Sequence, residues 1–334
     1  MRRPLLAGVV SLLFCGWIVF SSVSQAQTVI LEPVGSIPGP ADVVRVLGGY
    51  AYIAAGRTLT IHDVSDPTTP EIRGSYTFPE EIWGFRIQGA RVYVGANFFG
   101  LGILDVSDAE SPTLVSSFET GGQTKNGAAF GNRVAIIDHM EGLVLVDFDP
   151  SNPARPLAVS SFFVDGYARD VVTAGSIAYV VDSPSGLYLF DLATPGPPQP
   201  VGILQSPNSP HWIEVSSPEP GGTLLVCGAG AGDLQIYDVS DPSMPVHAST
   251  FVTPGRAHRV ALEDGLAFVA DGSAGIQVVD LADPTRPALL GTHLTPRPAR
   301  GIAVAGSLVF VIMGESEREG EDREVVILRV VRSR

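Results

Sequence analysis

The chain has 334 residues, of which 45% are hydrophobic and 17% are charged, with 37 glycines and 27 prolines. This composition excludes a disordered chain and favours a folded protein that is rich in turns and poor in long helices. The formal net charge of -14 at pH 7 argues against nucleic acid as a partner, because phosphate binding needs a basic face.

The first 26 residues are expected to form a signal peptide. Two arginines precede an apolar run over residues 5–20, and the segment that ends at Ala26 offers small residues where a signal peptidase cleaves. Cleavage would export residues 27–334 as one domain, either periplasmic, on the cell surface or secreted. The competing interpretation is an uncleaved membrane anchor, since the run approaches the shortest bilayer span of ~17 residues. No later segment of the sequence is apolar enough to span a membrane.

An apolar segment that ends in aspartate recurs along the whole chain. It reads "IHDVSDPTTP" from residue 61 and returns as "ILDVSDAESP", "IYDVSDPSMP" and "VVDLADPTRP". The equivalent positions are Asp63, Asp105, Asp147, Asp191, Asp238, Asp280 and, in "VVILRVV", Arg329. Their spacings are 42, 42, 44, 47, 42 and 49 residues. Seven units of this period are typical of a propeller with four-stranded blades.

Each unit predicts four short strands, called A to D here. Over residues 167–205 these are "RDVVT", "IAYVV", "LYLFD" and "PVGIL", separated by Gly, Ser and Pro turn signals. The Asp-Val-Ser-Asp-Pro element is then the turn from C to D, where aspartate caps backbone N–H groups and proline ends the strand. Calcium binding by these aspartates is the alternative, although the glycine-punctuated spacing of calcium loops is missing.

A displaced outer strand is expected to close the ring. The D strands carry a Gly-Ser-like mark, and a further copy, "VGSIP", stands at residues 34–38, before the first A strand. The chain ends just after the seventh C strand, so the N-terminal copy would complete the last blade and remove an exposed edge. The prediction is an all-β, seven-bladed β-propeller of four-stranded antiparallel blades.

The repeat resembles the LVIVD-repeat family. The resemblance rests on "LVLVD" at 143–147, "DVSDP", "GYARDVV" and "IAYVVD", and it covers the chain from about Val29. Asp149 in "DFDPSNP" and Thr194 in "DLATPG" depart from the turn pattern. The resemblance implies a propeller-like fold on exported or surface proteins, and it implies no established reaction and no catalytic residues.

The start of strand A points to a candidate site. Strand A is expected innermost, and the loops from D to A and from B to C share the rim at which it begins. The resulting ring reads Ala41, Trp83, Lys125, Arg169, His211, His258 and Arg300. Five of these seven residues are basic types in an acidic protein, which favours a cationic mouth for an anionic ligand.

The competing interpretation of this ring is structural. If residues 131, 175 and 264 begin two-residue hairpin turns, three basic residues face acids at the end of strand B. The predicted pairs are Lys125 with Asp138, Arg169 with Asp182, and His258 with Asp271. Cross-strand pairs contribute ~0.2 to 1 kcal/mol each, and they would explain these residues without a ligand.

The other basic residues lack such partners, since Arg300 is expected opposite Met313 and His211 near Gly228. They are joined by two tryptophans and by the third B to C loop, which carries His139 and Glu141. The candidate ligand-binding residues are therefore Trp83, Lys125, His139, Arg169, His211, Trp212, His258 and Arg300.

Familiar catalytic motifs for phosphate, nucleophile, metal and haem chemistry are absent from the sequence. We therefore expect a monomeric, non-catalytic binding or scaffold propeller without cofactor or metal, which binds a protein or a small anionic ligand. The alternative is a hydrolase or lyase in which His211 and His258 act at the mouth beside Arg300. The charged run "ESEREGEDRE" at 315–324 is expected to be a solvated loop, with partner or cation binding as the less favoured interpretation.

Overall fold

The computed structural model describes residues 28–149, 152–164, 166–183, 185–205, 210–216, 224–229, 232–315 and 322–332. The expected signal peptide and its cleavage point lie outside these ranges, as does the centre of the charged run, residues 316–321. Within the described residues, no helix is long and apolar enough to cross a membrane.

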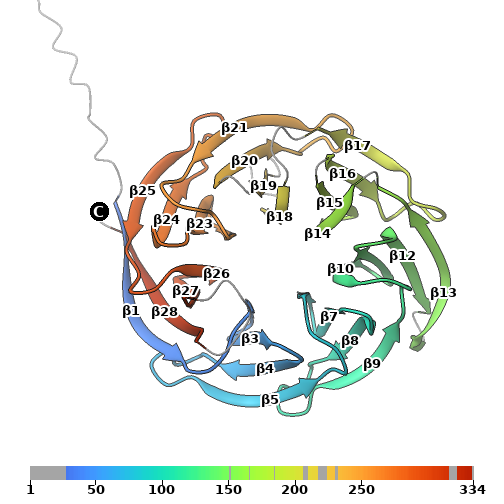
Figure 1. Cartoon of the computed structure of the whole chain (residues 1–334), viewed down its shortest axis with the longest axis horizontal. Helices are drawn as coiled ribbons and strands as arrows, with labels where there is room; N and C mark the ends of the chain where they lie inside the picture. The colour runs from blue at the N-terminus through green and yellow to red at the C-terminus, as the bar shows by residue number, and fades with distance from the viewer. Residues whose placement is uncertain are drawn as a thin grey trace, which may run out of the picture.

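The described strands occupy four positions from the centre of the molecule to its edge (Figure 1). The innermost strands are β2 (Val43–Leu47), β6 (Gly84–Gln88), β10 (Thr124–Phe130), β14 (Tyr167–Ala174), β18 (Pro210–Val215), β22 (Arg259–Glu263) and β26 (Ala299–Ala305). The second strands are β3 (Tyr50–Ala55), β7 (Arg91–Ala96), β11 (Arg133–Asp138), β15 (Ile177–Ser183), β19 (Leu224–Ala229), β23 (Leu266–Ala270) and β27 (Leu308–Met313). The third strands are β4 (Thr58–Asp63), β8 (Gly100–Asp105), β12 (Gly142–Asp149), β16 (Gly186–Asp191), β20 (Asp233–Asp238), β24 (Ile276–Asp280) and β28 (Glu324–Arg332). The outer strands are β5 (Glu71–Thr77), β9 (Thr113–Phe118), β13 (Asn152–Phe162), β17 (Pro200–Leu204), β21 (Val246–Val252), β25 (Ala288–His293) and β1 (Val29–Ile37).

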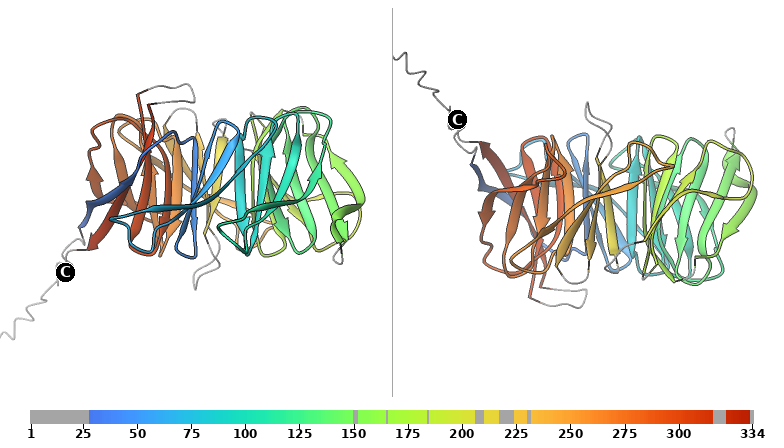
Figure 2. Two further views of the ribbon diagram at one scale, coloured as in Figure 1. Left: turned by 90° about the horizontal axis from the view of Figure 1, so that it is seen from below. Right: turned by 90° about the horizontal axis from the view of Figure 1, so that it is seen from above.

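These strands form seven four-stranded antiparallel sheets, which stand side by side around a central axis. Six sheets follow chain order, beginning with β2-β3-β4-β5, and the remaining one has the order β1-β28-β27-β26. Seen from the side, the molecule is a disc whose strands run between two rims (Figure 2). The predicted all-β propeller is confirmed.

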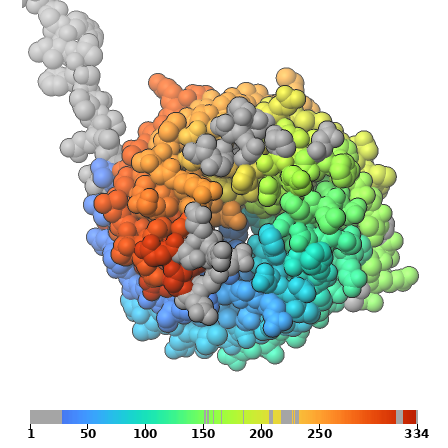
Figure 3. Space-filling view, in the orientation of Figure 1, coloured from blue at the N-terminus to red at the C-terminus, as the bar shows by residue number. Residues whose placement is uncertain are grey.

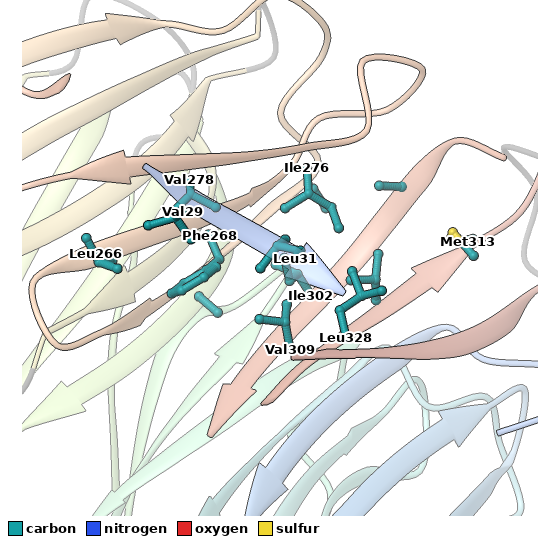
Figure 4. Close-up of a cluster of buried hydrophobic side chains, with 14 residues drawn as sticks. Val29, Leu31, Leu266, Phe268, Ile276, Val278, Ile302, Val309, Met313 and Leu328 are labelled. Atoms are coloured by element: carbon teal, nitrogen blue, oxygen red, sulfur yellow. The ribbon is translucent and has the colours of Figure 1, made fainter. Parts of the chain in front are cut away.

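The ring closes through the N-terminal strand, as the sequence predicts. Strand β1 pairs with β28 from Val29 opposite Arg332 to Ile37 opposite Val325. Val29 and Leu31 are buried in a cluster with residues of the neighbouring sheet, including Phe268, as Figure 4 shows. Strand β1 therefore covers the edge of β28 and also adds apolar surface to the core.

Apolar side chains fill the space between neighbouring sheets. One such cluster joins the sheets of β11 and β15, and another joins those of β3 and β7. The second strands are buried on both faces, so they read as continuous apolar runs such as "LAFVA" in β23. The outer strands have exposed residues and a more mixed composition.

The repeated aspartates cap turns. Asp63 accepts hydrogen bonds at Oδ1 from the backbone N of Ser65 at 3.0 Å and from its Oγ at 2.6 Å. Asp66 does the same for Thr68, at 2.9 and 2.6 Å. These turns are Asx-type caps built from the side chain and backbone of residues two positions apart.

Three of these turns also pack against a neighbouring sheet. A Cβ atom added at Gly74 in β5 would clash with the backbone oxygen of Ala109, in the turn that follows β8. Gly202 in β17 meets the turn oxygen of Pro242 in the same way, and Gly35 in β1 meets that of Pro67. At these places the outer-strand glycine and the capped turn form one contact between sheets, so the repeat has an architectural role.

Candidate functional site

Four of the inner strands carry a β-bulge at their first residues. In β10, Thr124 lies opposite Asp138 and Asn126 lies opposite Ile137, so Lys125 is the extra residue. The same shift occurs in β14, β18 and β26. The bulged residues are Lys125, Arg169, His211 and Arg300. A bulge re-aims the side chain at the end of a strand, here at the rim of the central opening.

The bulges overturn the predicted pairs in β10 and β14. Asp138 lies opposite Thr124 rather than Lys125, and Asp182 lies opposite Ala168 rather than Arg169. The predicted hairpin turns exist, but the extra residue shifts the register after them by one position. The Asp138 carboxylate instead accepts hydrogen bonds from the backbone N of Met140 at 2.8 Å and holds the β11–β12 loop.

The bulges also change the predicted positions of Arg300 and His211. Ala299, not Arg300, lies opposite Met313. Trp212, not His211, lies opposite Gly228. Each basic side chain is thus displaced by one residue from the position that a regular ladder predicts.

The predicted pair of His258 with Asp271 is wrong as well. Strand β22 begins one residue after His258, and Asp271 accepts hydrogen bonds from Oγ1 of Thr253 at 2.7 Å and the backbone N of Gly255 at 3.0 Å. Nε2 of His258 lies 3.0 Å from Nη1 of Arg300. A guanidinium only donates, so Nε2 must accept and the imidazole is neutral.

Two adjoining pockets open at the centre of the ring, where Figure 3 shows a hollow. Their volumes are about 250 and 300 Å³. The first contains Trp83, Lys125, Arg169 and His211 among its lining residues. The second contains Trp83, Arg256, His258, Arg300 and Arg323. Trp83 lines both pockets, which together form the cationic mouth.

Trp83 and Lys125 meet at this mouth. Nζ of Lys125 lies over the indole ring, 2.8 Å from its centroid, and Trp83 remains 42% exposed. The contact is a cation–π interaction that holds the ammonium group at the opening. Ala41, the corresponding residue of the first repeat, is instead buried in the core.

Arg169 is one of the arginines that line the mouth. Its Nε is buried and makes no hydrogen bond, and no ion pair of Arg169 occurs among the residues that the structure describes. The guanidinium lies 5.8 Å from the ring centroid of Tyr167. Such a buried N–H without an acceptor is uncommon in folded proteins.

Two histidines stand beside Arg169. Burial, together with the charges of Lys125 and Arg169, lowers the pKa of His139. Burial and the charges of Arg169, Arg256 and Arg259 lower the pKa of His211. Both imidazoles are therefore neutral at pH 7, since cations disfavour a further positive charge.

Trp212 does not belong to the mouth. It is 4% exposed and lies in the core cluster with Val226 and Val260. A Cβ atom at Gly228 would clash with its indole ring, so this glycine leaves room for the tryptophan. The structure thus brings together the other predicted residues around the opening and separates Trp212 from them.

The sequence did not predict a polar cluster that lies below the mouth. Arg86 donates from Nη1 to Glu214 at 3.0 Å and from Nη2 to Asp170 at 3.3 Å. Asn126 donates to the same Asp170 carboxylate at 2.7 Å. Although burial acts against its charge, the carboxylates of Asp170 and Glu214 raise the pKa of Arg86. The alternation of strand residues could have indicated these side chains, because they follow the ring residues on the channel side.

The cluster separates the mouth from a second cavity. That cavity has a volume of about 280 Å³ and is lined by Arg45, Arg86 and Glu214, among others. Asp170 lines the first mouth pocket. Burial and the neighbouring Arg86 lower the pKa of Arg45 to about 10. The mouth therefore ends at a cluster of charged side chains.

The chemistry of the mouth suits an anion. Guanidinium, ammonium and indole groups surround it, while the nearby carboxylates of Asp138, Asp170 and Asp271 already accept hydrogen bonds. Within the described residues, no group of three or more His, Cys, Asp or Glu side chains gathers to hold a metal ion.

Comparisons with known proteins agree with the fold. The sequence pattern described as "LVIVD repeat" matches residues 38–78, 83–120, 121–164, 165–204, 227–253 and 254–295. No curated protein matches the sequence. The six matched stretches leave out the sheet that β1 forms with β26, β27 and β28.

Similar solved structures share the architecture at low sequence identity. The β-propeller domain of Cps50 (Swd1) from Myceliophteria thermophila has a TM-score of 0.73 at 11% identity, covering 90% of this chain and 100% of that one. A chain of the Mitotic Checkpoint Complex has a TM-score of 0.70 at 9% identity, covering 97% and 99%. Raptor from Chaetomium thermophilum has a TM-score of 0.67 at 12% identity, covering 91% of this chain and 30% of that one. These similarities concern the fold alone.

Proposed function

The chain belongs to the LVIVD repeat family, and we propose that it is a non-catalytic binding module that takes an anionic ligand in its cationic mouth. The observation that carries the proposal is Arg169, which lines the opening together with Lys125 and Arg259. An anionic oxygen in the mouth would accept from this guanidinium, and a charge-assisted hydrogen bond to guanidinium is among the stronger ones.

The electrostatics of the mouth support this role. Lys125, Arg256 and Arg300 line the same opening, and the Asp170 carboxylate below it is engaged by Arg86 and Asn126. Positive potential at the mouth thus contrasts with the overall negative charge of the chain. A cleft of one sign with low-dielectric walls concentrates ligands of the opposite sign.

The histidine contacts favour binding over turnover. Nε2 of His258 accepts from Arg300, so this nitrogen is engaged and cannot act as a base without losing that contact. Asp271, the acid predicted to face His258, accepts hydrogen bonds from Oγ1 of Thr253 and the backbone N of Gly255. A hydrolase or lyase that uses His211 and His258 is the alternative which measurable turnover would support.

We further propose that the module acts outside the cytoplasm. The proposal rests on the arginine pair, the apolar run over residues 5–20 and the small residues before Ala26. N-terminal sequencing of the exported protein should begin at Gln27, whereas retention of the apolar run would support an anchor.

A thermal-shift screen of small anions, neutral glycans and divalent metals tests the binding role. Anions are expected to raise the melting temperature, because a ligand at one hundred times its Kd stabilises by about 2.7 kcal/mol. Arg169→Ala should abolish the rise without lowering the melting temperature of the free protein. Arg286→Ala, whose side chain is 84% exposed in a distant turn, is the matched control and should keep the rise. Stabilisation by metals or neutral glycans alone would contradict the proposal.

A further inference from the structure

Three apolar side chains are exposed on the same rim as the mouth. Met140 lies in the β11–β12 loop, and Phe163 and Tyr167 lie where the chain passes from β13 into β14. They are 63%, 69% and 53% exposed. Large apolar side chains gathered at one place on a soluble protein often mark an interaction site. Met140, Phe163 and Tyr167 form an apolar ledge.

The ledge is continuous with the mouth. The imidazole of His139 stacks on Tyr167 at a centroid distance of 4.8 Å, and the guanidinium of Arg169 lies 5.8 Å from the same ring. The charges of Lys125 and Arg169 both act on His139. An occupant of the mouth could therefore extend over the ledge without crossing a gap.

The β11–β12 loop, which carries Met140, is held in place. The buried Asp138 carboxylate accepts hydrogen bonds from the backbone N of Met140 at 2.8 Å and of Glu141 at 3.1 Å. Gly142 has a φ of 82°, and a Cβ atom added there would clash with the backbone oxygen of Phe162 and crowd Phe163. A ledge ordered in advance loses little conformational entropy on binding.

We propose that the mouth and the apolar ledge together bind a polypeptide segment in which acidic residues adjoin an aromatic or long aliphatic residue. The acidic side chains enter the cationic mouth beside Arg169, and the apolar side chain lies on the ledge. This inference rests on the proposed function, because it assigns a partner class to the same mouth. Side chains that follow one another in an extended segment are only ~3.3 Å apart along the chain, so one short segment can reach both surfaces.

The charges set the direction of such a segment. The exposed Glu141 lies in the loop of Met140, and it disfavours a second carboxylate on the outer side of the ledge. The cations lie on the inner side, where Lys125 and Arg169 line the mouth. The acidic part of the segment therefore points toward the central axis and the apolar part toward the rim.

Two capped peptides test the inference by titration calorimetry. One has the sequence Asp-Asp-Phe-Asp-Phe-Asp, and in the other both phenylalanines are replaced by glycine. The wild-type protein should bind the phenylalanine peptide at least about tenfold more tightly, because only that peptide covers the ledge. The combined change of Met140→Ser and Phe163→Ser should remove this preference and leave binding of the glycine peptide unchanged. Leu294→Ser, at a residue that is 75% exposed on another loop, is the control and should keep the preference.

The outcomes separate the inference from the proposed function. If the ledge variant still prefers the phenylalanine peptide, or if the wild-type protein binds both peptides equally, the ledge is not part of the binding site. Binding of the glycine peptide would in that case still support the cationic mouth as an anion site. Binding of sulfate but of neither peptide limits the mouth to small anions. If sulfate and both peptides all fail to bind, the inference and the proposed function fall together. Arg169→Ala should weaken both peptides, and unchanged melting temperatures would show that the variants remain folded.

Discussion

Nη1 of Arg86 lies 3.0 Å from Oε2 of Glu214, although their inner strands, β6 and β18, belong to sheets that are three positions apart around the ring. The same guanidinium reaches Asp170 and the backbone oxygens of Val171 and Ile213. Arg86 therefore crosses the central channel and connects sheets that have no strand pairing with one another.

Arg86→Ala should lower the free energy of unfolding by about 3 kcal/mol, because it leaves Asp170 and Glu214 near the centre without their main cation. Chemical denaturation followed by fluorescence measures this loss. Arg91→Ala removes a more exposed partner of Asp105 and should cost less than about 1 kcal/mol. Equal effects of the two substitutions would show that the channel contacts are energetically like surface pairs.

The closing strand offers a second prediction. Leu31→Ala should destabilise the protein by roughly 2 to 5 kcal/mol, because Leu31 is 3% exposed in the cluster shared with Phe268 and Leu328. Ile30, the adjacent residue of β1, is 50% exposed, and Ile30→Ala should change stability by less than about 0.5 kcal/mol. Thermal melts of both variants test whether β1 contributes to the core, and similar losses would contradict that role.

A third prediction concerns the bulge in β14. A regular ladder would pair Arg169 with Asp182, whereas the bulge places Ala168 opposite that acid. A double-mutant cycle of Arg169→Ala and Asp182→Asn should therefore give a coupling in stability below the ~0.2 kcal/mol at which cross-strand pairs begin. A coupling near 1 kcal/mol would restore the structural interpretation of Arg169 and remove the main support for the anion site.

The sequence predicts the propeller because its repeat is encoded locally. Asp63 and its equivalents cap turns by accepting hydrogen bonds from residues two positions away. The segment "VGSIP" predicts a strand, and that strand pairs with β28 at the other end of the chain. The ring of basic residues also follows from the repeat period. Local patterns therefore suffice for the fold and for the residues around the mouth.

The contacts within the mouth could not be read from the same patterns. The β-bulges in β10 and β14 change which residues lie opposite Lys125 and Arg169. No turn residue in the sequence indicates where these bulges occur. Trp212 lies in the core because Gly228 makes room for it, which depends on packing across the sheet. Arg86 pairs with Asp170 two sheets away and with Glu214 three sheets away, and such pairings depend on closure of the ring.

Anion affinity should depend on pH through His211. Burial and the charges of Arg169, Arg256 and Arg259 lower its pKa, so the free protein carries a neutral imidazole at pH 7. A bound anion favours the imidazolium and raises this pKa, and so affinity should increase as the pH falls below about 6.5 and level off below the pKa of the free state. The increase is at most about tenfold per pH unit for one proton.

Sulfate titrations from about pH 7.5 to pH 5 measure this dependence, because the charge of sulfate is constant over that range. His211→Ala should flatten the profile, while His293→Ala, at a residue on the outer strand β25, should not. An affinity that is independent of pH in the wild-type protein would show that His211 does not face the anion.

The central claim is that Arg169 and its neighbours form an anion site at the mouth. Titration calorimetry with a benzene polycarboxylate tests it most directly, using wild-type protein, Arg169→Ala and the distant control Arg286→Ala. We predict saturable binding of one ligand per chain in the wild type and in the control, with affinity at least about tenfold weaker in Arg169→Ala, a difference of about 1.4 kcal/mol. Binding of equal strength in all three proteins, or no binding to the wild type, would contradict the claim.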